Sequence, residues 1–191
     1  MYFANMGKQE IIKIGDLSFK QYLSADEIRQ QVVRVAQELS NDLKGKNPIF
    51  LVVLNGAFMF AADLMREMQI PCEVYFVRFS SYEGTHTTGS VREVLGLNAS
   101  IEGRTVVIVE DIVDTGLTMK GMIENLKSKN PQAIHVATLF LKPHSLREDI
   151  NVQYCCFEIP NDFIVGYGLD YNQAGRNLPQ IYVVDDAQRK E

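Results

Sequence analysis

TVVIVEDIVDTGLTM, residues Thr105–Met119, is the stretch of sequence that decides the fold. Its run Val106–Val109 is apolar and β-branched throughout, which is typical of a strand buried on both faces of a parallel sheet. Glu110 and Asp111 follow where such a strand would reach the carboxyl edge of the sheet. Residues 114–118 then predict a short polar turn, and Met119–Lys129 predicts an amphipathic helix.

A buried strand, an acidic pair, a polar turn and a helix start are together the parts of a phosphate site. Backbone N–H groups of a turn and a helix N-terminus converge on an anion, and adjacent carboxylates hold a hard cation. From the residues alone, an acidic pair after a strand is equally typical of doubly wound sheets without this chemistry. The turn has neither G-x-x-x-x-G-K-[ST] nor G-x-G-x-x-G, which excludes those two nucleotide-binding motifs.

The string Val107–Met119 resembles the signature with which type I phosphoribosyltransferases bind 5-phosphoribosyl diphosphate (PRPP). VEDIVDTGLT resembles the version of the hypoxanthine-guanine enzymes, and the resemblance covers nearly all of the 191 residues. It implies an α/β fold with a mostly parallel central sheet flanked by helices and a small hood over its carboxyl edge. The implied activity is purine salvage, in which PRPP and hypoxanthine, or guanine, give IMP or GMP and pyrophosphate.

The composition is that of one globular domain. A net charge of −5 and a pI near 5.3 argue against general affinity for nucleic acid or anionic membranes. The chain has no run of eighteen apolar residues and no signal-peptide pattern, so we expect a cytoplasmic protein. Its cysteines, Cys72, Cys155 and Cys156, fit buried thiols in a reducing compartment, and its histidines lack zinc-ligand spacing.

Strands and helices alternate on both sides of the central stretch. The capping box Ser24–Glu27 starts one helix. The other predicted elements between residues 24 and 142 are a helix at 57–68 and strands at 49–54, 72–79 and 133–141. This alternation predicts parallel strands with right-handed crossovers. We expect a single domain over residues 1–191, with a core of about 24–142 plus 181–185 and a hood formed by 1–23 and 143–180.

The resemblance assigns the PRPP site residue by residue. Asp114 would be the catalytic base. The ribose and its 5′-phosphate would be bound by Glu110, Asp111, Asp114, Thr115, Gly116, Leu117 and Thr118. Pyrophosphate would be bound by Leu54, Asn55, Gly56 and Arg176, with an implied cis peptide bond between Leu54 and Asn55. Relatives often carry lysine in place of Asn55, so this chain lacks one positive side chain there.

The purine would be bound by Lys142 at its 6-oxo group, by stacking on Phe163, and by the backbone of Ile164. Asp162 stands where relatives usually have lysine. The polar segment 80–89 predicts either a mobile loop or the tip of a long hairpin that returns through Val91–Leu95. The resemblance makes its Ser81 and Tyr82 part of a lid. Judged by residue type alone, Lys142 could instead be a solvated lysine at a strand end, and Phe163 could be a buried core residue.

The implied cofactor is Mg²⁺. Asp170 would hold it through water, and Glu110 and Asp111 would assist indirectly through the ribose hydroxyls. Judged by residue type alone, Asp170 could instead cap a turn, and Arg176 could form a surface ion pair. The implied partners are PRPP and a 6-oxopurine, in a homodimer or homotetramer without nucleic acid or membrane. Hypoxanthine, guanine and xanthine stay open as the base, and a PRPP- or nucleotide-binding regulator on the same fold is the alternative function.

Overall fold

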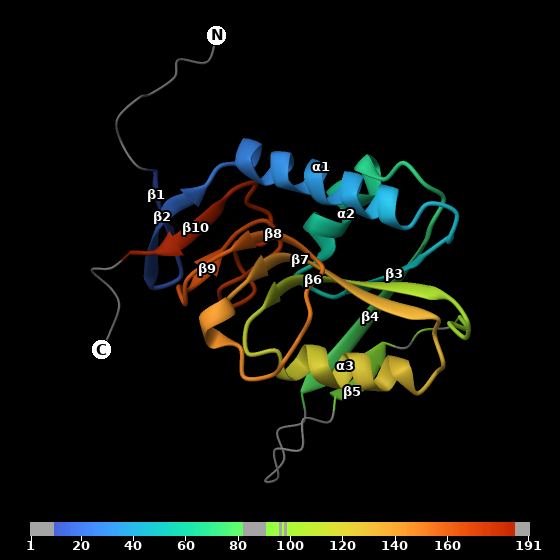
Figure 1. Cartoon of the computed structure of the whole chain (residues 1–191). Helices are drawn as coiled ribbons and strands as arrows, with labels where there is room; N and C mark the ends of the chain where they lie inside the picture. Colours follow the sequence, from blue (N-terminus) through green and yellow to red (C-terminus); the bar gives the residue numbers. More distant parts are fainter. Residues whose placement is uncertain (1–9, 82–90, 96, 98, 186–191) are drawn as a thin grey trace.

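The computed structural model describes residues 10–81, 91–95, 97 and 99–185, and its main body is a sheet between two layers of helices (Figure 1). The larger sheet has the strand order β5-β4-β3-β6-β7-β8. Its strands are β3 (Ile49–Val53), β4 (Glu73–Ser81), β5 (Val91–Leu95), β6 (Thr105–Val113), β7 (Ala133–Leu141) and β8 (Tyr154–Glu158). Every neighbouring pair is parallel except β4 and β5, the antiparallel arms of the predicted hairpin.

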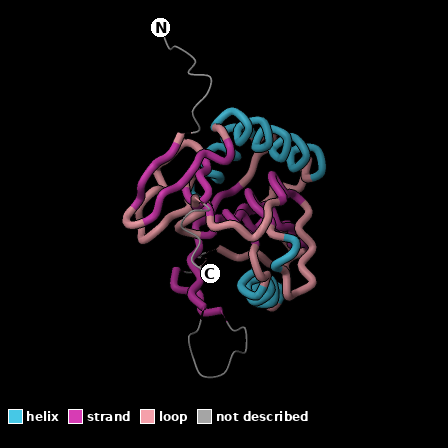
Figure 2. The backbone as a smooth tube through the Cα atoms, turned by 90° about the vertical axis from the view of Figure 1, so that its left-hand side faces the viewer, coloured by secondary structure: helices cyan, strands magenta, loops and turns pink. Residues whose placement is uncertain are grey.

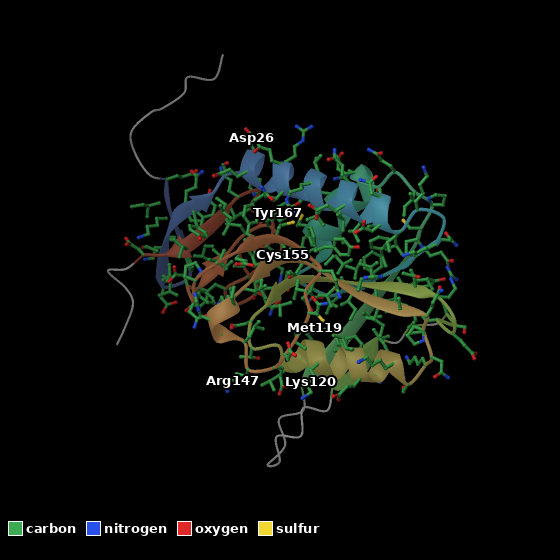
Figure 3. All side chains as sticks on the ribbon, in the orientation of Figure 1. Asp26, Met119, Lys120, Arg147, Cys155 and Tyr167 are labelled. Carbon is green, nitrogen blue, oxygen red and sulfur yellow. The ribbon has the colours of Figure 1, made fainter. Side chains whose placement is uncertain are left out.

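The helices cover the two faces of this sheet. Helices α1 (Ala25–Asp42) and α2 (Phe58–Glu67) lie on one face and α3 (Leu117–Lys127) on the other (Figure 1). The predicted capping box starts α1, with the Ser24 side chain accepting from the Glu27 N–H and the Glu27 carboxylate accepting from the Ser24 N–H at 2.8 Å. On α3, Met119 points toward the sheet and Lys120 away from it (Figure 3). The central parallel sheet with flanking helices is therefore confirmed.

A second, smaller sheet forms the hood. It consists of β1 (Ile11–Ile14), β2 (Leu17–Leu23), β10 (Ile181–Val184) and β9 (Ile164–Val165), in that order and all antiparallel. Figure 2 shows it as a separate group of strands beside the helix-covered sheet. The hood touches the loop after β3, because a Cβ added at Gly168 would lie 2.0 Å from the Gly56 carbonyl oxygen.

The predicted division between core and hood was wrong at the last strand. Residues 181–185 were assigned to the core, but β10 pairs with β2 and β9 of the hood. The strand is buried on both sides, with Ile181 and Val183 packed in the α1–α2 core and Tyr182 and Val184 in the hood cluster. An apolar run of this kind suits either sheet, so its composition does not reveal which sheet it joins.

The division was also wrong for β8, which lies within the predicted hood segment 143–180 yet pairs in parallel with β7. The connection between these two strands carries only a single 3₁₀ turn, η1 (Pro143–Ser145), in place of a crossover helix. The alternation of strands and helices that predicts a parallel sheet from a sequence is therefore interrupted between β7 and β8. Within the described part of the chain, no helix is long and apolar enough to cross a bilayer.

Candidate active site

The acidic pair lies inside β6 and not after it, because the strand continues four residues past its predicted end at Val109. Glu110 pairs with Thr138 of β7, so both carboxylates are held on rigid backbone near the carboxyl edge of the sheet. Burial, followed by the charge of Asp111, raises the pKa of the Glu110 carboxyl well above its usual range. The Asp111 side chain accepts the N–H of Ile112 at 2.8 Å, which fixes its orientation.

The phosphate turn follows directly. Gly116 precedes the first residue of α3 with a left-handed φ of 78°, so the helix begins at Leu117, two residues before the predicted start. The N-terminal N–H groups of α3 therefore face the turn itself. A cavity of about 110 Å³ lies at this point, bounded by Glu110, Ile112, Val113, Asp114, Thr115, Gly116, Thr118 and Met119. It brings together most of the residues predicted to bind the ribose 5′-phosphate.

The loop after β3 lies beside the acidic pair. Its peptide bond between Leu54 and Asn55 is cis, as the family resemblance implied. A Cβ added at Gly56 would lie 1.4 Å from the Asp111 carboxylate, so only glycine fits against that side chain. Because β3 and β6 are parallel neighbours, their carboxyl ends bring these two predicted PRPP-binding segments into contact.

Arg176 and Asp170 form an ion pair of 2.6 Å in the hood. Arg176 also donates to the Gly168 carbonyl at 2.8 Å, and Gly168 packs against the Gly56 backbone. Asp170 accepts the Gln173 N–H at 2.8 Å, so it caps a turn as well. The hood therefore places this pair next to the predicted pyrophosphate loop at residues 54–56.

On the other side of the phosphate turn, Asp114 faces Lys142. Their side chains approach to 3.5 Å, with Asp114 48% exposed and Lys142 only 12% exposed. Lys142 is therefore not the solvated strand-end lysine that its residue type alone allowed. A second hollow of about 530 Å³ opens here, bounded by Asp114, Thr115, Lys142, His144, Ser145, Leu146, Arg147 and Asn161.

The sequence did not point to four of the polar residues around this hollow: His144, Ser145, Arg147 and Asn161. They lie in or near the short 3₁₀ turn η1 and in the loop after β8, which have no periodic pattern. Their only signal was position, since Pro143 follows Lys142 directly and Asn161 precedes Phe163 by two residues.

Phe163 is 44% exposed, which excludes the core position that its residue type alone allowed. Its ring meets Tyr171 edge-on at 5.8 Å and Phe19 at 6.2 Å. The next residue, Ile164, is buried and starts β9, which pairs with Val183. An aromatic ring held by two neighbouring rings and partly open to solvent suits stacking on a flat ligand.

The donor set fits Mg²⁺ held largely by a substrate. Glu110, Asp111 and Asp170 supply carboxylate oxygens, the ligands that Mg²⁺ prefers, but the described residues contain no group of three side chains able to form a metal cage. Magnesium commonly binds through one or two carboxylates together with phosphate oxygens and water, which agrees with this arrangement.

The predicted lid falls at the border of what the structure describes. Ser81 is the last residue of β4 and pairs with Val91, whereas Tyr82 lies outside the described residues.

The fold and the site together define a PRPP-binding α/β domain, and residues 18–172 match the phosphoribosyl transferase domain family. The chain is 38% identical to hypoxanthine-guanine phosphoribosyltransferase of Mycobacterium tuberculosis over 170 residues, which are 85% of this chain and 84% of that protein. It therefore belongs to the hypoxanthine-guanine phosphoribosyltransferase family.

Solved structures of that family share the fold. A hypoxanthine-guanine phosphoribosyltransferase of Bacillus anthracis with HEPES in its active site has a TM-score of 0.84 and 35% identity, covering 91% of this chain and 100% of that one. A Trypanosoma cruzi hypoxanthine phosphoribosyl transferase, solved to study how its C-terminal region affects oligomeric state and activity, has a TM-score of 0.83 and 34% identity. That match covers 91% of this chain and 95% of the other.

Proposed function

We propose that this protein transfers the 5-phosphoribosyl group of PRPP to hypoxanthine and guanine, forming IMP or GMP and releasing pyrophosphate. The observation that carries the proposal is the position of Asp114. Asp114 bounds both the 110 Å³ phosphate cavity and the 530 Å³ hollow next to Lys142. One carboxylate thus lies where a ribose 5-phosphate and a base would meet.

The reaction breaks the bond between the anomeric carbon of PRPP and its pyrophosphate oxygen and forms a bond from that carbon to a purine ring nitrogen. The anomeric centre becomes cation-like on the way, so the protein needs to align the two reactants more than to supply a nucleophile. Residues 114–118 would cradle the 5′-phosphate, and Glu110 and Asp111 would hold the ribose hydroxyls. Lys142 would donate to the 6-oxo group, Phe163 would stack on the base, and Asp114 would accept the proton that the base loses.

Mg²⁺ would neutralise charge on the departing pyrophosphate. Asp170 would hold the ion through water, while Glu110 and Asp111 would assist through the ribose hydroxyls. The backbone of residues 54–56 and the Arg176 side chain would bind the pyrophosphate itself. Since Asn55 is uncharged, its loop would contribute backbone N–H groups without a cationic side chain.

Ser81 and Tyr82 would close over the bound substrates and exclude water from the ribosyl centre. The support for this part is the hairpin formed by β4 and β5, which carries the segment between them, together with the family resemblance of its sequence. Replacement of Tyr82 by alanine should therefore lower turnover more than it changes thermal stability.

We also propose a cytoplasmic homo-oligomer. The support is an uncovered part of the large sheet, where Val74 and Phe76 on one face of β4 are 38% and 51% exposed. Their partners in β3, Phe50 and Val52, lie on the same face and are fully buried under the helices. A second copy of the chain would cover this apolar face.

The direct test is to incubate the purified protein with PRPP, Mg²⁺ and each of hypoxanthine, guanine and xanthine, and to follow nucleotide formation. We expect IMP and GMP to form, and formation to stop when the metal is removed with a chelator. Binding of PRPP without any nucleotide formation would instead support the regulatory alternative, which no feature of this site favours.

A further inference from the structure

We infer that Ser145 and Asn161 position the two base-binding side chains, Lys142 and Phe163, relative to each other without touching the base. This inference rests on the proposed function and adds two positioning residues to it. Lys142 directly follows β7 and Phe163 directly precedes β9, so the two side chains lie on different segments and the chain needs a contact that fixes their separation.

The Ser145–Asn161 contact joins the two segments that carry these side chains. The Ser145 hydroxyl donates to the Asn161 side-chain oxygen. The Ser145 N–H donates to the Lys142 carbonyl at 3.0 Å, closing the 3₁₀ turn directly after Lys142. Asn161 precedes Phe163 by two residues, so the contact links the segment that carries Lys142 to the segment that carries Phe163.

The location of this contact explains why a side-chain bond is needed. The ladder between β7 and β8 ends at Leu141 and Glu158, and the Ile159 N–H adds a last bond to the Leu141 carbonyl at 2.9 Å. Beyond this point the segments at 142–147 and 160–163 leave the sheet. The Ser145–Asn161 bond continues the connection beyond the ladder, four residues past Leu141 on one segment and three past Glu158 on the other, beside the hollow that Asp114 and Lys142 share.

The phosphate side of the same segment has its own attachments. The Arg147 N–H donates to the Thr115 carbonyl at 3.0 Å. Leu146 and Ile150 pack against Gly116, where an added Cβ would lie 3.3 Å and 3.0 Å from their side chains. Loss of the Ser145–Asn161 bond would therefore loosen the base side of the segment and leave the phosphate turn in place.

This asymmetry gives a kinetic signature. Removing one such hydrogen bond should raise KM for the base about 2- to 10-fold, the range expected when one net hydrogen bond is lost. KM for PRPP should change by less than about twofold, because its contacts at residues 114–118 are untouched. Neither a hydroxyl nor an amide titrates between pH 6 and 9, so the ratio of variant to wild-type KM should be constant across that range.

The experiment compares Ser145→Ala, Asn161→Ala and the double variant with the wild-type enzyme, measuring kcat and both KM values with hypoxanthine and PRPP. The double variant should resemble the single ones, because both substitutions remove the same bond. Ser145→Thr keeps a hydroxyl and should restore KM for the base toward wild type. Ser128→Ala is the matched control, since the Ser128 hydroxyl donates to the Asn125 carbonyl at 2.7 Å, at the far end of α3.

The outcomes separate this inference from the proposed function. A wild-type protein that forms no nucleotide would overturn the proposed function before any variant is tested. If the wild type is active, an unchanged KM for the base in Ser145→Ala, an equal rise in both KM values, or additive effects in the double variant would overturn the positioning role alone.

Discussion

At the scale of single residues, the proposed function assigns the proton transfer to Asp114. Asp114→Asn should slow turnover by about 10²–10⁴, the usual contribution of a positioned general base. KM for PRPP and the thermal midpoint should stay near wild type, because asparagine is isosteric and the side chain is half exposed. Rapid-quench or steady-state IMP formation measures the effect, and turnover near the wild-type rate would remove Asp114 from this role.

The proposed function assigns Lys142 to the base and not to the phosphates. Lys142→Ala should raise KM for hypoxanthine and guanine by about 10-fold or more, since a hydrogen bond from a charged donor contributes about 1.5–3 kcal/mol. KM for PRPP should be nearly unchanged. Lys127→Ala, which removes a lysine at the last turn of α3, is the matched control. Equal changes in the two constants would point to a phosphate contact in place of a base contact.

The sequence singled out these residues because each lies directly beside a recognisable element. Asp114 and Gly116 follow the buried strand β6, and Lys142 directly follows β7. Local patterns did not locate Ser145 or Asn161, whose position depends on contacts between segments sixteen residues apart. The irregular backbone there has no period that a sequence could display.

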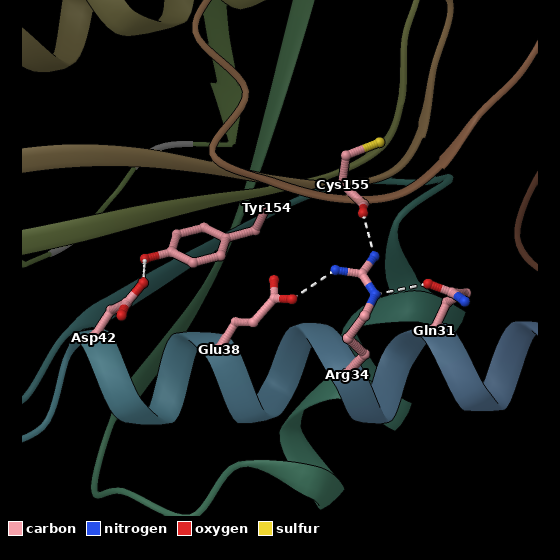
Figure 4. A network of polar contacts seen from close by, with 6 residues as sticks. All are labelled: Gln31, Arg34, Glu38, Asp42, Tyr154 and Cys155. Atoms are coloured by element: carbon pink, nitrogen blue, oxygen red, sulfur yellow. Dashed lines mark hydrogen bonds and ion pairs between the residues drawn. The ribbon is translucent and has the colours of Figure 1, made fainter.

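At the scale of elements, the junction between α1 and β8 shows how the edge of the sheet is fixed. Arg34 of α1 donates to the Cys155 carbonyl at 2.6 Å and pairs with Glu38, and Tyr154 donates to Asp42 at 2.9 Å (Figure 4). Burial raises the pKa of the Cys155 thiol to about 11, in keeping with a packing role for that residue. These polar contacts, spaced along one face of α1, attach β8 to the helix. The position of β8 in the sequence did not indicate that this strand joins the larger sheet.

Tyr154→Phe tests this junction. Loss of the bond to Asp42 should lower the free energy of unfolding by about 0.5–1.5 kcal/mol at neutral pH. Burial and the Asp42 hydrogen bond raise the pKa of Tyr154 to about 12, above the value of about 10 in an unfolded chain. The proton is held more tightly in the folded state, so this stabilisation is present below pH 10 and is lost as the pH rises toward 12.

The stability difference between wild type and Tyr154→Phe should therefore shrink between pH 10 and pH 12. Urea unfolding at a series of pH values measures it. Asp42→Asn is the companion variant, because it keeps an acceptor for the hydroxyl but removes the charge that adds to the pKa shift. A difference that stays constant up to pH 12 would show that Tyr154 titrates alike in both states.

At the scale of the whole molecule, the alternation of strands and helices predicted the parallel core, but not the exchange of segments between core and hood. Residues 181–185 return to the hood because β2, near the start of the chain, offers them an antiparallel partner. Pairing between segments about 160 residues apart in the sequence produces no local sequence pattern from which it could be predicted. The predicted hood therefore rests on the loss of strand–helix alternation after Lys142. The segments that this prediction assigned to the hood were only partly right.

Val74 and Phe76 form an uncovered apolar surface on β4, and strands with such a face are usually covered by another element or by a second chain. Phe76→Ser should lower the measured molecular mass toward that of one 21.6 kDa chain, because it removes the larger of the two exposed side chains. Size-exclusion chromatography with light scattering measures the mass at several protein concentrations.

Ile11→Ser is the control, since Ile11 is 62% exposed but lies on β1, at the edge of the hood sheet. It should leave the mass unchanged. Nucleotide formation measured on the same samples shows whether the single chain is active, because β4 leads into the hairpin that carries the proposed lid. A wild-type protein that is already a single chain, or a Phe76→Ser variant with the wild-type mass, would show that this surface is not where copies of the chain meet.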